Sequence, residues 1–249
     1  ESTTVGDRPT DRLAPAGEVS DQVVYYLHGG AYLGGSPRSH RGLLAHFAKA
    51  AGCEVVALDY RLAPQHVWPA QRTDLAAALD FLKSRATALG LDPARFVLCG
   101  RSAGGQIAQT VAYTAGDPSI RGVISLYAPS DLIFGYVNTT EDDMLRSPTL
   151  MRQYLGGSPD TARAAYESAS ALFHVSATVP PTLLLHGTTD ALVWYRHSVR
   201  LAARLAEVRA PHVYLALPWA THAFEYNLNG PGGQLTRFSV AWFLAAVTR

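Results

Sequence analysis

A single serine lies between glycines directly after an apolar stretch of the chain. The sequence GRSAGG at 100–105 follows RFVLC at 95–99 and places Ser102 at the centre of a G-x-S-x-G pattern. A serine at a turn between a buried strand and a helix can act as a nucleophile, because the turn raises its hydroxyl and the helix start offers free N–H groups. A small-residue turn that serves packing alone has the same pattern, so the rest of the chain must decide.

Two later loops carry the acid and the histidine that such a serine needs. A serine hydroxyl is unreactive near neutral pH unless a base takes its proton and a third group orients that base. TLLLHGTTD at 182–190 places Asp190 after one strand-like run, and HVYLALPWATHAF at 212–224 places His222 after the next. The chain order Ser102, Asp190, His222 is the order of α/β-hydrolases. We therefore predict that these three residues form a catalytic triad.

Asp131 is a competing candidate for the acid of this triad. It follows another strand-like run, GVISLY at 122–127. Asp190 is preferred because HGTTD fits the expected motif, whereas Asp131 comes one strand earlier.

Acyl transfer also needs hydrogen-bond donors for the developing oxyanion, each worth roughly 3–4 kcal/mol of barrier. The sequence HGGA at 28–31 follows an early strand candidate, and its small residues allow a tight turn with exposed N–H groups. We predict an oxyanion hole formed by the amides of Gly29, Gly30, Ala31 and Ala103.

Four residues beside this predicted site are candidates for the substrate pocket, although ordinary packing would explain each of them equally well: Tyr32, Leu192, Val193 and Phe224. The nine histidines show no metal-ligand spacing, and neither GG pair is accompanied by the lysine of a phosphate-binding loop. The expected metal and cofactor content is therefore none.

Short apolar runs alternate with helix-like segments along most of the chain, a pattern typical of a mostly parallel sheet wrapped by helices. The strand candidates are 23–27, 54–60, 95–99, 122–127, 182–186 and 212–217. We predict one α/β domain over residues 1–249. Residues 1–22 are expected to form an extended arm or a weak edge strand, and residues 129–181 an inserted lid or pocket wall.

Composition excludes several functional classes. The net charge is +1 with no basic cluster, so a nucleic-acid partner is not expected. No apolar run reaches the roughly 18–20 residues of a membrane helix, and the profile favours a soluble, cytoplasmic protein. The chain begins with Glu1 rather than Met, so we expect that an upstream segment has been removed. The oligomeric state is left open.

The motifs together resemble those of the hormone-sensitive-lipase-like esterases of the α/β-hydrolase fold. The resemblance rests on HGGAY, DYRLAP, LDPARFVLCGRSAGG, HGTTD and THAF, and it runs from about residue 23 to the C-terminus. It implies hydrolysis of carboxylic esters without metal or cofactor. It also implies nucleophile, acid and base roles for Ser102, Asp190 and His222, and an oxyanion hole in the HGGA loop.

The chain departs from that family at three places. Arg101 stands where the family's elbow more often has an acidic residue, which leaves its ionic partner open. Ala31 replaces the third glycine of the HGGG motif. The N-terminal cap and first strands are expected to be short or missing, so that the pocket roof comes from residues 129–181 or from a partner chain.

We therefore expect a serine hydrolase for small or short-chain acyl or aryl esters, with a small-molecule ester as its partner. Two alternatives stay open. One is an amide- or peptide-cleaving serine hydrolase, similar to arylformamidases or prolyl peptidases, because the same triad serves both chemistries. The other is a binding module that uses the fold without catalysis.

Overall fold

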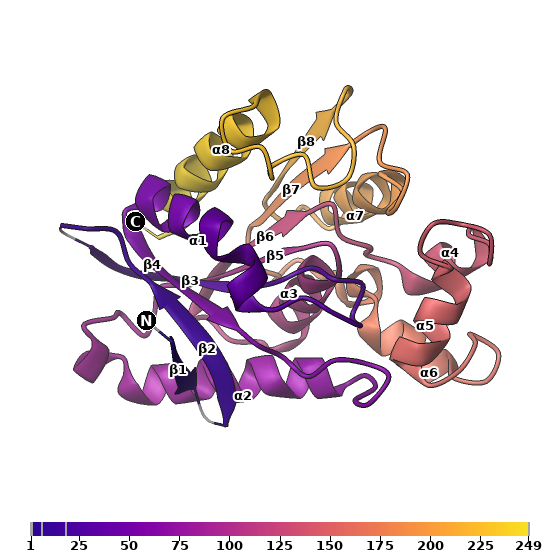
Figure 1. Cartoon of the computed structure of the whole chain (residues 1–249), viewed down its shortest axis with the longest axis horizontal. Helices are drawn as coiled ribbons and strands as arrows, with labels where there is room; N and C mark the ends of the chain where they lie inside the picture. The colour runs from indigo at the N-terminus through magenta and orange to yellow at the C-terminus, as the bar shows by residue number, and fades with distance from the viewer. Residues whose placement is uncertain (1, 6, 18, 249) are drawn as a thin grey trace.

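A twisted, mostly parallel sheet forms the centre of the fold (Figure 1). The structure is a computed structural model and describes residues 2–5, 7–17 and 19–248. Within these residues the strand order is β1-β2-β4-β3-β5-β6-β7-β8. The pairs β1–β2 and β2–β4 are antiparallel, and all other pairs are parallel. The strands are β1 (Ser2–Val5), β2 (Arg8–Leu13), β3 (Ser20–Leu27), β4 (Cys53–Leu58), β5 (Phe96–Arg101), β6 (Ile120–Leu126), β7 (Thr182–Gly187) and β8 (His212–Leu217).

Helices cover both faces of the sheet, which explains the near-continuous apolarity of the central strands. Successive residues of β5 point to opposite faces: Leu98 belongs to one hydrophobic cluster and Val97 to the other. The first cluster includes residues of α2 (Ala70–Arg85), α3 (Ala103–Thr114) and α7 (Arg196–Glu207). The second includes residues of α1 (Pro37–Ala51) and α8 (Pro231–Val247). The predicted α/β architecture is confirmed.

The N-terminal segment contributes two short strands to the sheet edge. The sequence left open whether these strands are short or missing, and the structure has the short ones within the predicted arm at 1–22, together with the start of β3. The pairing of β2 with β4 places Thr10 opposite Leu58. An ion pair between Arg12 and Glu54, with Nη2 and Oε2 2.8 Å apart, joins the same two strands.

The inserted segment at 129–181 lies at one end of the molecule (Figure 1). It contains α4 (Leu132–Val137), α5 (Ser147–Leu155), α6 (Arg163–Ala169) and a 3-10 turn, η2 (Ala171–His174). Buried polar contacts attach it to α3: the Tyr154 hydroxyl donates to Gln106 Oε1 over 3.0 Å, and Gln106 donates to the Ala169 carbonyl over 2.5 Å. These contacts make the segment a packed wall of the structure.

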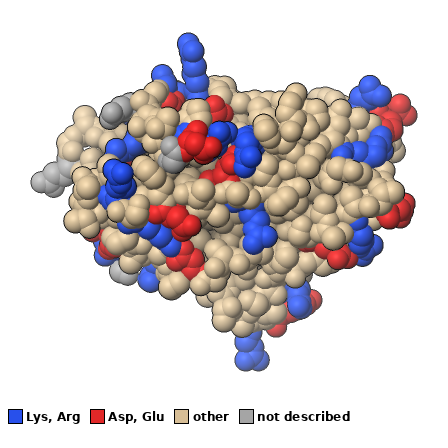
Figure 2. Space-filling view, turned by 90° about the horizontal axis from the view of Figure 1, so that it is seen from below, with Lys and Arg blue, Asp and Glu red and all other residues tan. Residues whose placement is uncertain are grey.

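Three further features concern surface and chemistry. Basic and acidic side chains are intermixed on the face shown in Figure 2. Cys53 and Cys99 are both buried and unpaired. Within the described residues, no helix has the length and apolarity needed to span a membrane.

Candidate active site

Ser102 occupies a sharp turn between β5 and α3. Its φ of 49° and ψ of −125° lie in a region that costs a non-glycine residue about 1–3 kcal/mol. The flanking glycines make this turn possible. A Cβ on Gly100 would collide with the backbone of Gly104, and a Cβ on Gly104 would collide with the carbonyl groups at the end of β3. The G-x-S-x-G pattern therefore reflects close backbone packing around a strained serine.

His222 and Asp190 come from the loops after β8 and β7 and are hydrogen-bonded to each other. The distance from His222 Nδ1 to Asp190 Oδ2 is 2.6 Å. The other carboxylate oxygen, Oδ1, accepts hydrogen bonds from the amides of Leu192 and Val193, each at 2.9 Å. Asp190 is thus a buried acceptor that holds the imidazole by its Nδ1–H and leaves Nε2 free to act as a base.

The electrostatics of Asp190 favour its ionised form. Burial raises the pKa of this carboxyl group, but the interactions with His186 and His222 outweigh burial, and the pKa lies well below its usual range. The His186 ring lies beside Asp190, with Nε2 3.4 Å from Oδ2. It is held by the Val193 carbonyl, 2.9 Å from Nε2, and by the Ser198 hydroxyl, 2.8 Å from Nδ1.

Asp131, the competing acid, has other partners. Its side chain caps α4 by accepting a hydrogen bond from the Phe134 amide at 2.9 Å, and it pairs with Arg200 at 2.6 Å. Since both carboxylate oxygens are engaged there while His222 is bonded to Asp190, the geometry favours Asp190 as the acid.

Ser102 is linked to the neighbourhood of His222 through β6. The Ser102 amide donates to the Leu126 carbonyl at 2.9 Å, and the ring of the next residue, Tyr127, packs edge-on against His222 at 4.4 Å. Among the described residues no hydrogen bond joins the Ser102 hydroxyl to His222. Such bonds are often long in ligand-free enzymes and shorten when substrate binds.

The HGGA loop lies directly against the serine turn. A Cβ on Gly29 would stand 3.3 Å from Ser102 Cβ. Gly30 and Ala31 have φ values of 134° and 54°, and the Gly30 carbonyl accepts hydrogen bonds from the amides of Leu33 and Gly34. Within the described chain the amides of Gly30 and Ala31 donate no backbone hydrogen bond. Ala31 and Ala103 both line the cavity that contains Ser102.

His28 holds this loop from behind. Its ring stacks on Tyr60 at 4.2 Å, and Nδ1 lies 2.8 Å from the Gly29 carbonyl. Burial lowers the pKa of His28 to about 4, so the imidazole is neutral and Nδ1–H donates to that carbonyl. His28 therefore fixes the position of the HGGA loop by a hydrogen bond to its backbone.

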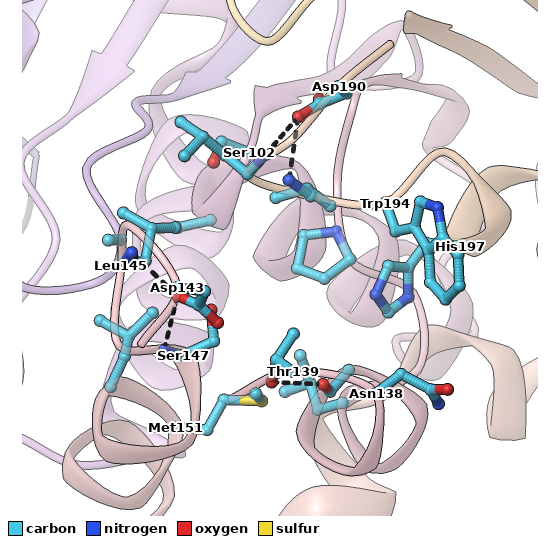
Figure 3. A pocket seen from close by; sticks show the side chains of 18 of the residues that line it. Ser102, Asn138, Thr139, Asp143, Leu145, Ser147, Met151, Asp190, Trp194 and His197 are labelled. Carbon is cyan, nitrogen blue, oxygen red and sulfur yellow. Dashed lines mark hydrogen bonds between the residues drawn. The ribbon is translucent and has the colours of Figure 1, made fainter. Parts of the chain in front are cut away.

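A cavity of about 390 Å³ opens beside Ser102 (Figure 3). Its walls come from the serine turn, the HGGA loop, the inserted α4–α5 segment and the loop after β7. Tyr32, Leu192 and Val193, three of the four pocket candidates, line it. The fourth, Phe224, is placed elsewhere in the described structure: it packs edge-on against Tyr127 at 5.2 Å and joins the core on the α1–α8 face.

His197 is a pocket residue that the sequence did not reveal. It lies in the first turn of α7, is 4% exposed and packs edge-on against Phe134 at 5.1 Å. Neither of its ring nitrogens forms a hydrogen bond in the described part of the chain. Only its position in the sequence could have pointed to the pocket, because it falls seven residues after Asp190, at the start of the next helix.

A pH-dependent loss of stability is expected from His197. Burial lowers its pKa from 6.5 to about 3, so the unfolded chain binds one more proton between these pH values. Its contribution is therefore complete above about pH 6.5 and declines as the pH falls, by about 1.4 kcal/mol per pH unit. Urea unfolding at pH 7, 6 and 5 measures this slope, and H197N is expected to make it shallower by about one proton. An equal slope in both proteins would contradict the prediction.

A buried ion pair joins the serine turn to the loop that carries His222. Arg101 Nη1 lies 3.3 Å from Glu225 Oε1, although the two atoms form no aligned hydrogen bond. Glu225 is fully buried and also accepts a hydrogen bond from Tyr127, while the guanidinium stacks over Tyr226 at 4.4 Å. Glu225 is thus the partner for Arg101 that the sequence left open.

Removing one member of this pair is expected to destabilise the fold. Replacing Glu225 by leucine leaves the guanidinium buried and uncompensated, which typically costs about 3–5 kcal/mol of unfolding free energy. Urea unfolding at constant pH measures the loss. The double variant R101L/E225L is expected to lose less than the two single variants together, because it buries no lone charge. If E225L has the same free energy of unfolding as the wild-type protein, the buried Arg101 guanidinium does not require this carboxylate.

Comparisons with known proteins identify the family of the chain. Over residues 24–226 the sequence matches the family described as alpha/beta hydrolase fold. This chain belongs to the α/β-hydrolase family. The predicted fold and the predicted resemblance to hormone-sensitive-lipase-like esterases are both confirmed. A crystal structure of an esterase from the bacterial hormone-sensitive lipase family superimposes on this α/β-hydrolase with a TM-score of 0.83 at 28% identity, covering 100% of this chain and 84% of the other.

Curated relatives of this α/β-hydrolase carry ester-hydrolase names. A Mycobacterium tuberculosis protein named "Probable carboxylic ester hydrolase LipM" is 30% identical over 240 residues, which are 90% of this chain and 54% of the relative. "Esterase LipC" of the same organism is 28% identical over 242 residues, 91% of this chain and 59% of the relative. The chain therefore spans between half and three fifths of the length of these two relatives.

Proposed function

We propose that this chain is a serine hydrolase that cleaves carboxylic esters through an acyl-enzyme. The observation that carries the proposal is the hydrogen bond between His222 and Asp190, in a site where Ser102 lies on a strained turn and shares a cavity with Asp190. The names of the similar proteins, which are esterases and carboxylic ester hydrolases, support it.

The first half of the proposed reaction forms the acyl-enzyme. His222 Nε2 takes the hydroxyl proton of Ser102 as the oxygen attacks the ester carbonyl carbon. Asp190 keeps the imidazole in the Nδ1–H tautomer and stabilises the imidazolium that forms. His222 then gives the proton to the leaving alcohol, and the C–O bond of the ester breaks.

The second half returns the free enzyme. Water replaces the alcohol, and His222 removes its proton as the oxygen attacks the acyl carbon. The bond from that carbon to Ser102 Oγ then breaks, His222 returns the proton to Oγ, and the carboxylic acid leaves. In both tetrahedral intermediates the negative oxygen is held by the backbone N–H groups of Gly30, Ala31 and Ala103, with Gly29 beside them. The uncommitted amides of the HGGA loop suit this role.

Substrates of small or short-chain acyl or aryl type fit the proposed site. The inserted segment forms one wall of the cavity of about 390 Å³, and it contributes apolar residues such as Leu132, Phe134 and Met151. Tyr32 also lines this cavity, and its buried ring is held in place by stacking on Tyr154 at 3.6 Å.

Amide cleavage is the second candidate function. The human protein named arylacetamide deacetylase-like 3 is 42% identical over 111 residues, which are 43% of this chain and 27% of that protein. The triad proposed here would serve an amide as well as an ester, so the two functions differ only in the substrate that the cavity favours.

Covalent labelling and a matched substrate panel test the proposal. A fluorophosphonate probe is expected to label the wild-type protein and not S102A. We expect p-nitrophenyl butyrate to be cleaved at least about a hundredfold faster, in kcat/KM, than the p-nitroanilide of the same acid. Equal or faster anilide, formyl-anilide or peptide cleavage would favour the amide function. A wild-type protein that neither reacts with the probe nor cleaves any substrate would favour a non-catalytic binding module.

A further inference from the structure

The cavity beside Ser102 contains a polar side chain without a hydrogen-bond partner among the described residues. His197 lines the cavity, is 4% exposed and makes no side-chain hydrogen bond with any described residue. Buried polar groups in native proteins are almost always paired, and an unpaired one calls for an explanation such as an absent ligand. Figure 3 shows His197 beside Trp194 on the wall that faces Thr139 and Asp143.

We propose that His197 donates a hydrogen bond to an oxygen atom in the part of the ester that fills the cavity, so that the enzyme prefers esters with an ether or hydroxyl oxygen there over plain alkyl esters. This inference rests on the proposed ester hydrolysis at Ser102. His197 has no part in the chemical step and acts on specificity.

The tautomer of His197 follows from its surroundings. A neutral imidazole has one N–H donor and one bare acceptor nitrogen. Nδ1 is the buried nitrogen without a partner, and an orphaned acceptor is better tolerated in an interior than an orphaned N–H. The proton is therefore assigned to Nε2, the nitrogen that remains to meet a ligand. Burial, which lowers the pKa of His197 to about 3, keeps the ring neutral at working pH.

Gly135 leaves room for that ligand. It lies on α4, lines the same cavity, and has no side chain to cover the imidazole edge. A Cβ at this position would stand 3.5 Å from both Cε1 and Nε2 of His197. The distance is an ordinary van der Waals contact, so a methyl group would fit without a clash while it shields the ring nitrogen.

A second unsatisfied polar atom lies on the opposite wall. Asp143 Oδ1 accepts hydrogen bonds from the Leu145 amide at 2.9 Å and from the Ser147 amide and hydroxyl at 3.1 Å, but Oδ2 is buried without a partner. The cavity thus has an unpaired imidazole on one wall and an unpaired carboxylate oxygen on the other. Because Asp143 also organises its own turn, His197 and Gly135 are the cleaner positions for mutation.

Esters that differ by one atom provide the test. p-Nitrophenyl hexanoate is compared with its 3-oxa, 4-oxa and 5-oxa analogues, which replace one CH₂ by oxygen at constant length. The matched acetates of hexan-1-ol and of the corresponding oxa-alcohols cover the case in which the alcohol part enters the cavity. The measured quantity is the kcat/KM ratio of each oxa ester to its hydrocarbon partner, for wild type, H197L, H197N and G135A.

At one oxygen position the wild-type ratio is expected to exceed that of H197L by about tenfold, which corresponds to about 1.4 kcal/mol. H197N retains an N–H donor and is expected to recover part of the preference. G135A keeps the histidine, favours the helix and is expected to lose most of the preference, so the test does not depend on replacing His197 itself. Intrinsic differences in ester reactivity cancel, because each is the same for every variant.

The outcomes separate this inference from the proposed function. Normal ester hydrolysis with oxa-to-hydrocarbon ratios that agree within twofold among wild type, H197L and G135A would overturn the role of His197 and leave the hydrolase intact. Absence of hydrolysis by the wild-type protein across both series would overturn the proposed function and this inference together.

Discussion

Replacing Ser102 by alanine is expected to lower kcat for p-nitrophenyl butyrate by about 10⁶, the scale seen when a serine hydrolase loses its nucleophile. The physical reason is that no other group on the strained turn can form the acyl-enzyme, so only the oxyanion hole and substrate binding remain. Because the alanine removes only the side-chain hydroxyl and keeps the backbone turn, the free energy of unfolding should change little. Steady-state rates and urea unfolding of the same preparation measure both effects.

S84A is the matched control for this experiment. Ser84 lies on α2, is exposed, and bonds only to the Phe81 carbonyl at 2.7 Å. Its replacement by alanine removes the same atom from a site remote from the cavity and should leave kcat unchanged. Full activity in S102A would show that Ser102 is not the nucleophile, and the proposed mechanism would then be wrong.

Replacing Asp190 by asparagine is expected to lower kcat by about 10⁴ while leaving KM within a few-fold of the wild-type value. An asparagine amide can donate to the imidazole, which favours the Nδ1-acceptor tautomer and puts the proton on the nitrogen that must act as the base. The carboxylate also stabilises the imidazolium, and its depressed pKa shows that the site favours this charge. Rates with p-nitrophenyl butyrate near pH 7.5 test the expectation.

D131N is the control that separates the two acids. Asp131 caps α4 and pairs with Arg200, so its replacement should reduce stability through the loss of a cap and an ion pair while kcat stays within about tenfold. If D131N loses activity like a triad variant and D190N does not, Asp131 is the acid and the proposed role of Asp190 is wrong.

The sheet could be predicted from the sequence because it follows from local residue patterns. The same is true of the positions of Ser102, Asp190 and His222 in loops after strands. Apolar runs buried on both faces specify parallel strands, and parallel strands bring their carboxyl ends to one edge of the sheet. The glycines around Ser102 also reflect a local constraint, because a larger side chain would collide with the backbone at that turn. Such features depend on neighbours in sequence and on a regular topology, so they can be inferred without coordinates.

Other features depend on which distant side chains meet, and no period or short motif encodes that. Phe224 packs against Tyr127 and the core on the α1–α8 face, and it is not among the described residues that line the cavity. Arg101 acquires Glu225 as its partner from a loop more than a hundred residues away. The sequence offered no way to pair these charges, since it contains many acidic residues at loop positions.

What the sequence determined by itself was therefore the fold class, the serine turn and the loop positions of the acid and the histidine, because each follows from local residue pattern and strand order. The tertiary structure decided the pairing of the short N-terminal strands with β4, the wall that the inserted segment builds, and the unpaired imidazole of His197 inside it. These arise from packing between segments far apart in the chain, where burial and hydrogen-bond satisfaction depend on three-dimensional neighbours rather than on sequence neighbours.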